Sequence, residues 1–194
     1  MTKIAIIDYN AGNVQSVYYA LKRIGVEANI TSNHQEIKNA DKVIFPGVGE
    51  ATSTMNYLNK SGLNVLIPKL EQPVLGICLG MQLLCSYTEE GKTDCLNIFP
   101  NKVKRFTGNE KIPHIGWNSI SNLKGKLFKD IKEDAYVYFV HSFYAEMQIG
   151  TIATCNYMDE FSAAIQKNNF YAVQFHPEKS GNTGQQILKN FIEL

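Results

Sequence analysis

The chain has 194 residues, a length typical of one compact domain. Its 19 basic and 18 acidic residues give a formal net charge of +1, and only Arg23 and Arg105 are arginines. A near-neutral, arginine-poor chain lacks the electrostatic footprint for nucleic acid or an anionic membrane. We therefore expect a single domain, residues 1–194, that binds neither nucleic acid nor membrane.

The cysteines indicate a reducing compartment. Cys78, Cys85, Cys95 and Cys155 form no CxxC pair and no zinc-type spacing, and no secretory signal is recognisable. The nucleotide-binding patterns GxGxxG after a strand and GxxxxGK[ST] do not occur either. We expect a cytoplasmic chain with no disulfide framework, no metal and no cofactor.

The first half of the chain alternates short apolar strands with helical segments. Strands are expected at 3–8, 26–31, 42–45 and 73–77, and helices at 14–24, 51–59, 63–70 and 79–86. His34 falls between two of these segments and is assigned to a polar loop. Alternation at this spacing predicts βαβ units, with a parallel sheet covered by helices on both faces.

The second half contains mostly strand-like segments separated by Gly, Asn and Asp turn signals. They are expected at 102–106, 135–140, 151–157, 162–166 and 170–175, before a closing helix with Ile187, Leu188, Phe191 and Ile192 on one face. The lysines and arginine between 102 and 111 are interpreted as a solvated face. The predicted fold is one three-layer α/β domain: a mostly parallel central sheet with an antiparallel extension in its second half.

Residues 76–82, Gly-Ile-Cys-Leu-Gly-Met-Gln, are the most informative segment. A strand ends, Cys78 occupies the turn, and a helix begins, as in a nucleophile elbow with small residues two positions before and after the nucleophile. A helix N-terminus favours a thiolate, and the backbone N–H of Leu79 is placed to stabilise an oxyanion. Most cysteines in apolar segments are plain core residues, and Cys85, Cys95 and Cys155 are interpreted that way.

A thiol nucleophile needs a base, and His176 is the strongest of the four histidines. It ends an expected strand and precedes Glu178 by two residues, so both side chains can lie on the same side of an extended segment. The carboxylate can then orient the imidazole while the other ring nitrogen meets the thiol of Cys78. The alternative is an ordinary surface histidine at a strand end.

Three motifs together identify a known family: residues 76–82, Pro-Gly-Val-Gly at 46–49 and His-Pro-Glu at 176–178. With them the chain resembles the class I glutamine amidotransferases, which implies a flavodoxin-like domain. Segments 8–13, 113–118, 138–142 and 176–181 narrow the resemblance to the glutaminase subunits of imidazole glycerol phosphate synthases. Two departures are Asn10, where the family often has glycine, and Cys95-Leu96-Asn97, where it commonly has Gly-Leu-Gly.

The resemblance implies roles for individual residues. Cys78 would be the nucleophile, His176 the base and acid, and Glu178 the orienting carboxylate. The other implied positions are Gln82, Glu90, Ser142 and Phe143 around the bound glutamine, Gly47, Val48, Gly49 and Leu79 at the oxyanion hole, and Asn13, Trp117 and Lys179 near a partner interface. The implied substrate is L-glutamine, and the implied partner is a (β/α)₈ synthase/cyclase subunit that receives ammonia through a tunnel.

Three alternatives remain at this point. The chain could be a paralogous amidotransferase that supplies ammonia to another partner, for example in sugar amination. It could instead be a non-enzymatic flavodoxin-like binding module with an incidental cysteine. A third reading is a cysteine hydrolase acting on peptides, although the polar Gln82 and Glu90 suit a small zwitterion better than a peptide.

Overall fold

The computed structural model describes residues 2–9 and 13–194, so Asn10 and its two successors lie outside the described residues. A seven-stranded sheet in the order β11-β12-β13-β4-β3-β1-β2 forms the centre of the molecule. Its strands are β1 (Ile4–Ile7), β2 (Ala28–Thr31), β3 (Lys42–Phe45), β4 (Val74–Ile77), β11 (Thr151–Tyr157), β12 (Asp159–Lys167) and β13 (Phe170–Val173).

The sheet is mostly parallel. β2, β1, β3, β4 and β13 run in the same direction, whereas β12 is antiparallel to both β13 and β11. This confirms the predicted parallel sheet with an antiparallel extension. Because the carboxyl ends of parallel strands meet at one edge, the segments that follow β1, β3, β4 and β13 converge there, and such edges are where α/β folds bind ligands.

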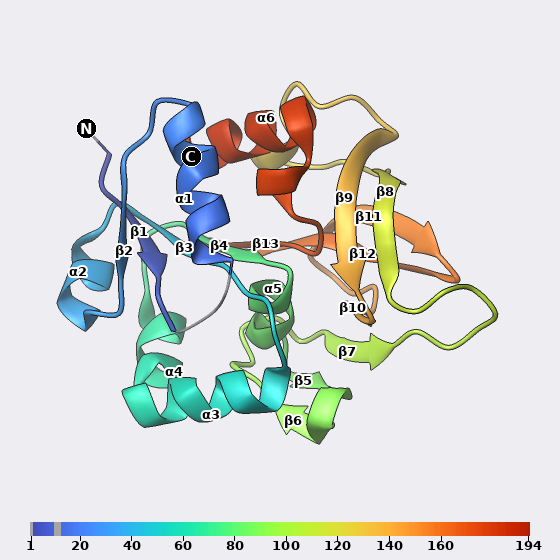
Figure 1. Ribbon diagram of the computed structural model, residues 1–194, viewed down its shortest axis with the longest axis horizontal. Coiled ribbons are helices and arrows are strands. Elements are labelled where there is room, and N and C mark those ends of the chain that lie inside the picture. The colour runs from blue at the N-terminus through green and yellow to red at the C-terminus, as the bar shows by residue number, and fades with distance from the viewer. Residues whose placement is uncertain (1, 10–12) are drawn as a thin grey trace.

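Helices cover both faces of the sheet (Figure 1). α1 (Val14–Arg23) and α6 (Gly181–Ile192) pack on one face. α2 (His34–Asn39), α3 (Ala51–Ser61), α4 (Leu63–Leu66) and α5 (Leu79–Leu84) pack on the other. Along β1, Ile4 and Ile6 enter one core while Ala5 and Ile7 enter the opposite one. A strand buried on both faces must be apolar throughout, as this run is.

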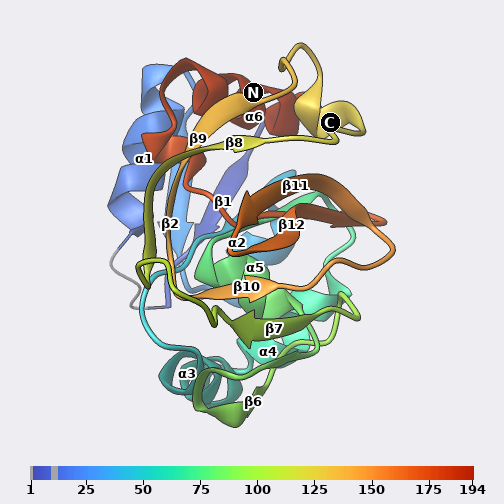
Figure 2. The same cartoon turned by 90° about the vertical axis from the view of Figure 1, so that its right-hand side faces the viewer.

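Two smaller sheets complete the fold. β8 (His114–Ile120) and β9 (Ala135–His141) form an antiparallel ribbon on the α1 and α6 side of the central sheet (Figure 2). The other sheet has the order β10-β7-β5-β6, with β10 (Phe143–Ala145), β7 (Lys102–Arg105), β5 (Tyr87–Thr88) and β6 (Thr93–Asp94). Single 3₁₀ turns lie at Ile67–Lys69, Glu90–Lys92, Lys126–Phe128 and Pro177–Lys179.

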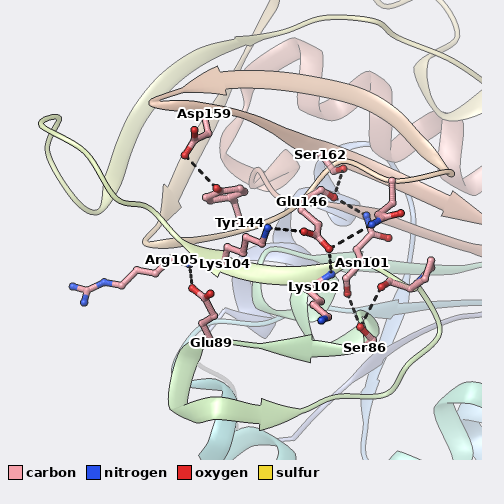
Figure 3. A network of polar contacts seen from close by, with 12 residues as sticks. Ser86, Glu89, Asn101, Lys102, Lys104, Arg105, Tyr144, Glu146, Asp159 and Ser162 are labelled. Atoms are coloured by element: carbon pink, nitrogen blue, oxygen red, sulfur yellow. Dashed lines mark hydrogen bonds and ion pairs between the residues drawn. The ribbon is translucent and has the colours of Figure 1, made fainter.

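The basic residues on β7 lie on an exposed face whose charges are partly compensated (Figure 3). The Lys104 ammonium pairs with the Glu146 carboxylate at 2.8 Å. The backbone N–H of Arg105 donates to the carboxylate of Glu89, also at 2.8 Å, while the Arg105 side chain extends away from these contacts. The arrangement agrees with the interpretation of a solvated face, on which exposed ion pairs contribute little to stability.

Several boundaries differ from the sequence-based prediction. His34 is not in a loop, because it begins α2. The Asn33 side chain caps the N-terminus of this helix by accepting from the backbone N–H groups of Gln35 and Glu36. The helix expected at 63–70 is α4 followed by a 3₁₀ turn, because Pro68 has no N–H to continue an α-helix. β8 and β10 were not predicted at all.

Within residues 2–9 and 13–194, no helix has both the length and the apolar composition that a bilayer span requires.

Candidate active site

Cys78 occupies a sharp turn between β4 and α5. Its backbone has φ 53° and ψ −109°, in a region that residues with a side chain rarely adopt. The turn is possible because of the flanking glycines. A Cβ on Gly80 would lie 2.0 Å from the carbonyl oxygen of Phe45, and one on Gly76 would lie 2.7 Å from Leu84 Cδ1. The predicted strand–turn–helix elbow is therefore present. Gly80 is required by its contact with backbone, whereas the atom nearest to a Cβ on Gly76 is the end of a side chain.

His176 and Glu178 meet just after β13, as expected, but the local geometry differs from the prediction: Glu178 lies in the 3₁₀ turn Pro177–Lys179 and not in an extended segment. His176 Nδ1 donates to Glu178 Oε1 at 2.8 Å, and both side chains are almost entirely buried. Burial by itself lowers the pKa of His176, but hydrogen bonds with Cys78 and Glu178 outweigh it and raise the pKa to about 10. The imidazole is therefore protonated at neutral pH, and the arrangement matches a cysteine nucleophile, a histidine acid–base and an orienting carboxylate.

Asn13 has a place in this arrangement that sequence reasoning missed. Its side chain is buried and donates through Nδ2 to Glu178 Oε1 at 2.5 Å. From α1, the Arg23 guanidinium reaches the backbone carbonyl of Glu178 at 3.4 Å. The carboxylate is thus held from the N-terminal part of the chain, 165 positions away in the sequence.

The predicted oxyanion segment follows β3 and lies against the elbow. The backbone N–H of Leu79 donates to the carbonyl oxygen of Gly47 at 3.3 Å. Gly47 packs so closely that a Cβ there would lie 2.5 Å from the Tyr9 hydroxyl. That hydroxyl in turn donates to the carbonyl of Pro46. In this conformation the Leu79 N–H, an expected oxyanion donor, is therefore already hydrogen-bonded to the Gly47 carbonyl.

A cavity of about 310 Å³ opens at this edge of the sheet. That volume is at the lower end of the range for small-molecule sites. The residues that line it are Val48, Gly49, Cys78, Leu79, Gln82, Glu90, Pro113, Val140, His141, Ser142, Phe143, His176 and Lys179. Ten of them were proposed from the sequence for the catalytic, oxyanion, substrate or interface roles. Pro113, Val140 and His141 were not, because no local sequence pattern indicates that the start of β8 and the end of β9 meet the elbow of Cys78.

The predicted substrate residues contribute polar groups to the cavity. Gln82 Nε2 donates to the carbonyl of Phe143 at 2.8 Å and to Gln174 Oε1 at 3.0 Å, so contact with a ligand falls to its carboxamide oxygen. Glu90 accepts from the N–H of Ala51 at 2.9 Å, and its pKa is raised, mainly by burial. Among the described residues, no group of three or more His, Cys, Asp or Glu side chains could hold a metal ion.

The three residues proposed for a partner interface lie in different environments. Trp117 is 54% exposed on β8, and Lys179 is exposed at the cavity. The side chain of Asn13, in contrast, is buried against Glu178.

Comparison with known proteins agrees with this geometry. Residues 5–194 match the family model described as glutamine amidotransferase class-I. The chain belongs to this family. It is 60% identical over 195 residues to the imidazole glycerol phosphate synthase subunit HisH of Bacteroides fragilis strain YCH46, covering 99% of this chain and 100% of that protein. The subunit of the same name from Pasteurella multocida is 46% identical, covering 100% and 98%.

Solved structures show the same fold at much lower identity. A glutamine amidotransferase structure superposes with a TM-score of 0.77 at 18% identity, covering 98% of this chain and 97% of that one. PurLQS from Thermotoga maritima gives a TM-score of 0.75 at 13% identity, covering 99% and 98%. This class I amidotransferase therefore has the α/β architecture expected of its family.

Two other histidines give the amidotransferase a testable acid sensitivity. Burial lowers the pKa of His141 to about 3 and that of His114 to about 4. As pH falls below about 6.5 the unfolded chain binds protons that the folded chain does not. The free energy of unfolding should therefore decrease by up to about 1.4 kcal/mol per pH unit for each histidine, as measured by urea unfolding between about pH 7 and pH 5.

His34, exposed on α2, provides the matched control for this prediction. The His34→Gln variant should retain the full acid dependence, whereas His141→Phe should reduce it by removing the contribution of His141 and leaving that of His114. An equal slope in all three proteins would contradict the assignment. The raised pKa of His176 has the opposite effect on the pH dependence of folding. Its contribution to the free energy of unfolding is complete below about pH 6.5 and is lost as pH rises through about 10.

Proposed function

We propose that this chain is the glutaminase subunit of an imidazole glycerol phosphate synthase in histidine biosynthesis. It would hydrolyse L-glutamine to glutamate and pass the ammonia to a (β/α)₈ synthase/cyclase subunit. The end-to-end similarity to relatives that carry this name supports the proposal most strongly. A cytoplasmic location belongs to the same proposal, in keeping with four free cysteines.

The reaction begins with attack of the Cys78 thiolate on the carboxamide carbon of glutamine. The protonated His176 then gives its proton to the departing ammonia, leaving a γ-glutamyl thioester on Cys78. Water activated by the now neutral imidazole attacks the thioester and releases glutamate, which regenerates the thiolate and the imidazolium. Glu178, held by Asn13, keeps the imidazole oriented through both steps.

The oxyanion that forms during attack needs two backbone donors, and here the Leu79 N–H is engaged by Gly47. A turn of the 47–49 segment would free that donor and direct a second N–H, from Val48 or its neighbour, into the cavity. Glycine on both sides of Val48 makes such a turn sterically accessible. We therefore expect hydrolysis to remain slow until a partner subunit that carries its own ligand binds and shifts the 47–49 segment.

The face of the β8–β9 ribbon that points away from the core is the proposed partner surface. Ile115 and Trp117 on β8 and Tyr136 on β9 expose 59%, 54% and 61% of their surface. Val140, on the same face, lines the cavity. Exposed aromatic residues beside a catalytic pocket are typical anchors of protein interfaces. A partner seated here would lie next to the site where ammonia is released.

The first test compares glutamate release by the chain alone and with the synthase subunit of the same organism. Release should be very slow alone and should rise by about a hundredfold or more when the partner carries its own ligand, because the oxyanion donors are then available. Equal release in both samples would argue against coupled hydrolysis. Activation by a sugar-aminating partner alone would favour the paralogous alternative.

A second test addresses the partner surface. Trp117→Ala should weaken binding of the synthase subunit by about 2 kcal/mol, or roughly thirtyfold in Kd by calorimetry. Val65→Ala on α4, a residue with the same 54% exposure, is the matched control and should leave the Kd within about twofold. A Kd unaffected by the tryptophan change would remove Trp117 from the interface.

A further inference from the structure

Two buried histidines face each other behind the cavity. His114 on β8 is paired in register with His141 on β9, and His114 Nδ1 lies 3.0 Å from His141 Nε2. The His114 ring stacks against Tyr157 and Phe139, with centroids 4.0 and 4.9 Å away. Neither histidine belongs to the triad, yet His141 reaches the cavity lining.

The hydrogen bonds of this pair can run in only one direction. His141 Nδ1 lies 2.8 Å from the carbonyl oxygen of Phe143, which can only accept, so Nδ1 carries the proton. His141 Nε2 is therefore an acceptor, and His114 must donate to it from Nδ1. His114 Nε2 in turn accepts from Asn118 Nδ2 at 3.4 Å. Both rings are thus neutral Nδ1–H tautomers.

The Phe143 carbonyl connects this pair to the nucleophile. It accepts from His141 and also from Gln82 Nε2, so two donors fix its orientation. The other Gln82 amide hydrogen is donated to Gln174 Oε1, and Gln174 Nε2 lies 3.7 Å from Cys78 Sγ. Gln174 is fully buried. A continuous series of hydrogen bonds therefore leads from β8 to the sulfur of Cys78.

The neutrality of the pair suits its position beside a charged triad. Burial holds the pKa of His141 near 3 and that of His114 near 4, and the charge of His176 lowers that of His141 further. The pair therefore does not compete with His176 for a proton at neutral pH. Its contribution is geometric: it supplies fixed donors and leaves the acid–base chemistry to the triad.

We propose that His114 and His141 are positioning residues for glutamine, which fix the Phe143 carbonyl and, through it, the Gln82 and Gln174 side chains beneath Cys78. This inference rests on the proposed glutaminase function. The proposal depends mainly on the hydrogen bond from His141 Nδ1 to the carbonyl oxygen of Phe143. Losing this bond leaves Phe143 with Gln82 as its remaining side-chain donor, which loosens the 142–143 segment of the cavity wall.

Two isosteric replacements at position 141 separate the two bonds of that ring. In His141→Asn the amide nitrogen occupies the place of Nδ1 and can still donate to Phe143. In His141→Gln the amide oxygen takes the place of Nε2, so the bond from His114 is kept and the one to Phe143 is lost. His141→Phe keeps the ring and loses both bonds.

Steady-state kinetics of the complex with the synthase subunit should distinguish these variants. His141→Gln and His141→Phe should raise KM for glutamine by about tenfold with kcat within about threefold, whereas His141→Asn should raise KM by less than about threefold. If packing alone mattered, asparagine, the smallest replacement, would be the most damaging. That order, or equal KM values in all three, would overturn the proposal.

Phe139→Leu is the packing control, because Phe139 stacks on His114 without a hydrogen bond to the pair. It should lower Tm while KM for glutamine stays within about twofold. A tenfold rise in KM for this variant would assign the effect to packing and contradict the proposal.

A nitrogen-15 NMR spectrum of the free chain gives a readout independent of activity. Both imidazoles should appear as neutral Nδ1–H tautomers at about pH 7, the less common form in water. An Nε2–H tautomer at His141 would overturn the inference even if glutamine is hydrolysed. Conversely, an inactive wild-type complex with the expected tautomers would reject the proposed function and leave the hydrogen-bond geometry intact.

Discussion

The Cys78→Ala variant should lose glutamine hydrolysis by a factor on the order of 10⁴ or more, because Cys78 is the one thiol among the described residues that line the cavity. Its fold should be retained, since alanine replaces a single sulfur atom and tolerates the φ of 53° no worse than cysteine does. The measurement is glutamate release in the complex with the synthase subunit, together with trapping of the γ-glutamyl thioester by mass spectrometry.

Cys95→Ala is the matched control for this experiment. Cys95 is half-buried, and burial together with nearby acidic groups raises the pKa of its thiol to about 12, so it is protonated at neutral pH. Its replacement should leave glutamate release within about twofold. Glutamate release that survives in Cys78→Ala, or is lost in Cys95→Ala, would refute the assignment of the nucleophile.

The Gly80→Ala variant should be severely destabilised. The added Cβ would lie 2.0 Å from the carbonyl oxygen of Phe45, so β3 and α5 would have to separate. Overpacking against backbone cannot be relieved by a rotamer change, and we expect a loss of about 3 kcal/mol or more in the free energy of unfolding. For a chain of this size that corresponds to a decrease in Tm of roughly 10 °C, measurable by calorimetry.

Gly25→Ala separates this steric effect from the general cost of replacing glycine. Gly25 has φ +79°, but a Cβ there would meet nothing within 4 Å. Its replacement should cost only the strain of a left-handed conformation, about 1 kcal/mol. Equal losses in the two variants would show that the contact with Phe45 is not what requires glycine at position 80.

The parts of the site that could be predicted from the sequence are those defined by local pattern. β1 and β4 are short runs of apolar residues buried on both faces, and the glycines around Cys78 mark a turn that only small neighbours permit. The pair His176 and Glu178 is likewise local, although a 3₁₀ turn and not the expected extended segment brings the two side chains together. Each of these signals lies within about seven residues, where spacing determines which side chains meet.

The parts that could not be predicted depend on contacts between distant segments. β8 has no apolar alternation, because two of its inward residues, the buried His114 and the half-buried Asn118, are held by hydrogen bonds to other strands rather than by hydrophobicity. Asn13 was placed at a partner interface by resemblance, and only the folded chain shows its contact with Glu178. A single sequence contains no periodicity that reports such pairs.

The contact between Asn13 and Glu178 also has a consequence for the order in which the chain is synthesised and becomes active. The two residues are separated by 165 positions, and β4, which ends just before Cys78, has β13 as one of its two neighbours in the sheet. Contacts this distant form late, and during translation the N-terminal part of a chain emerges first. A nascent chain, or one truncated before His176, thus contains the thiol without its base, so we expect ammonia production only after β13 and the residues up to Glu178 have been synthesised and folded.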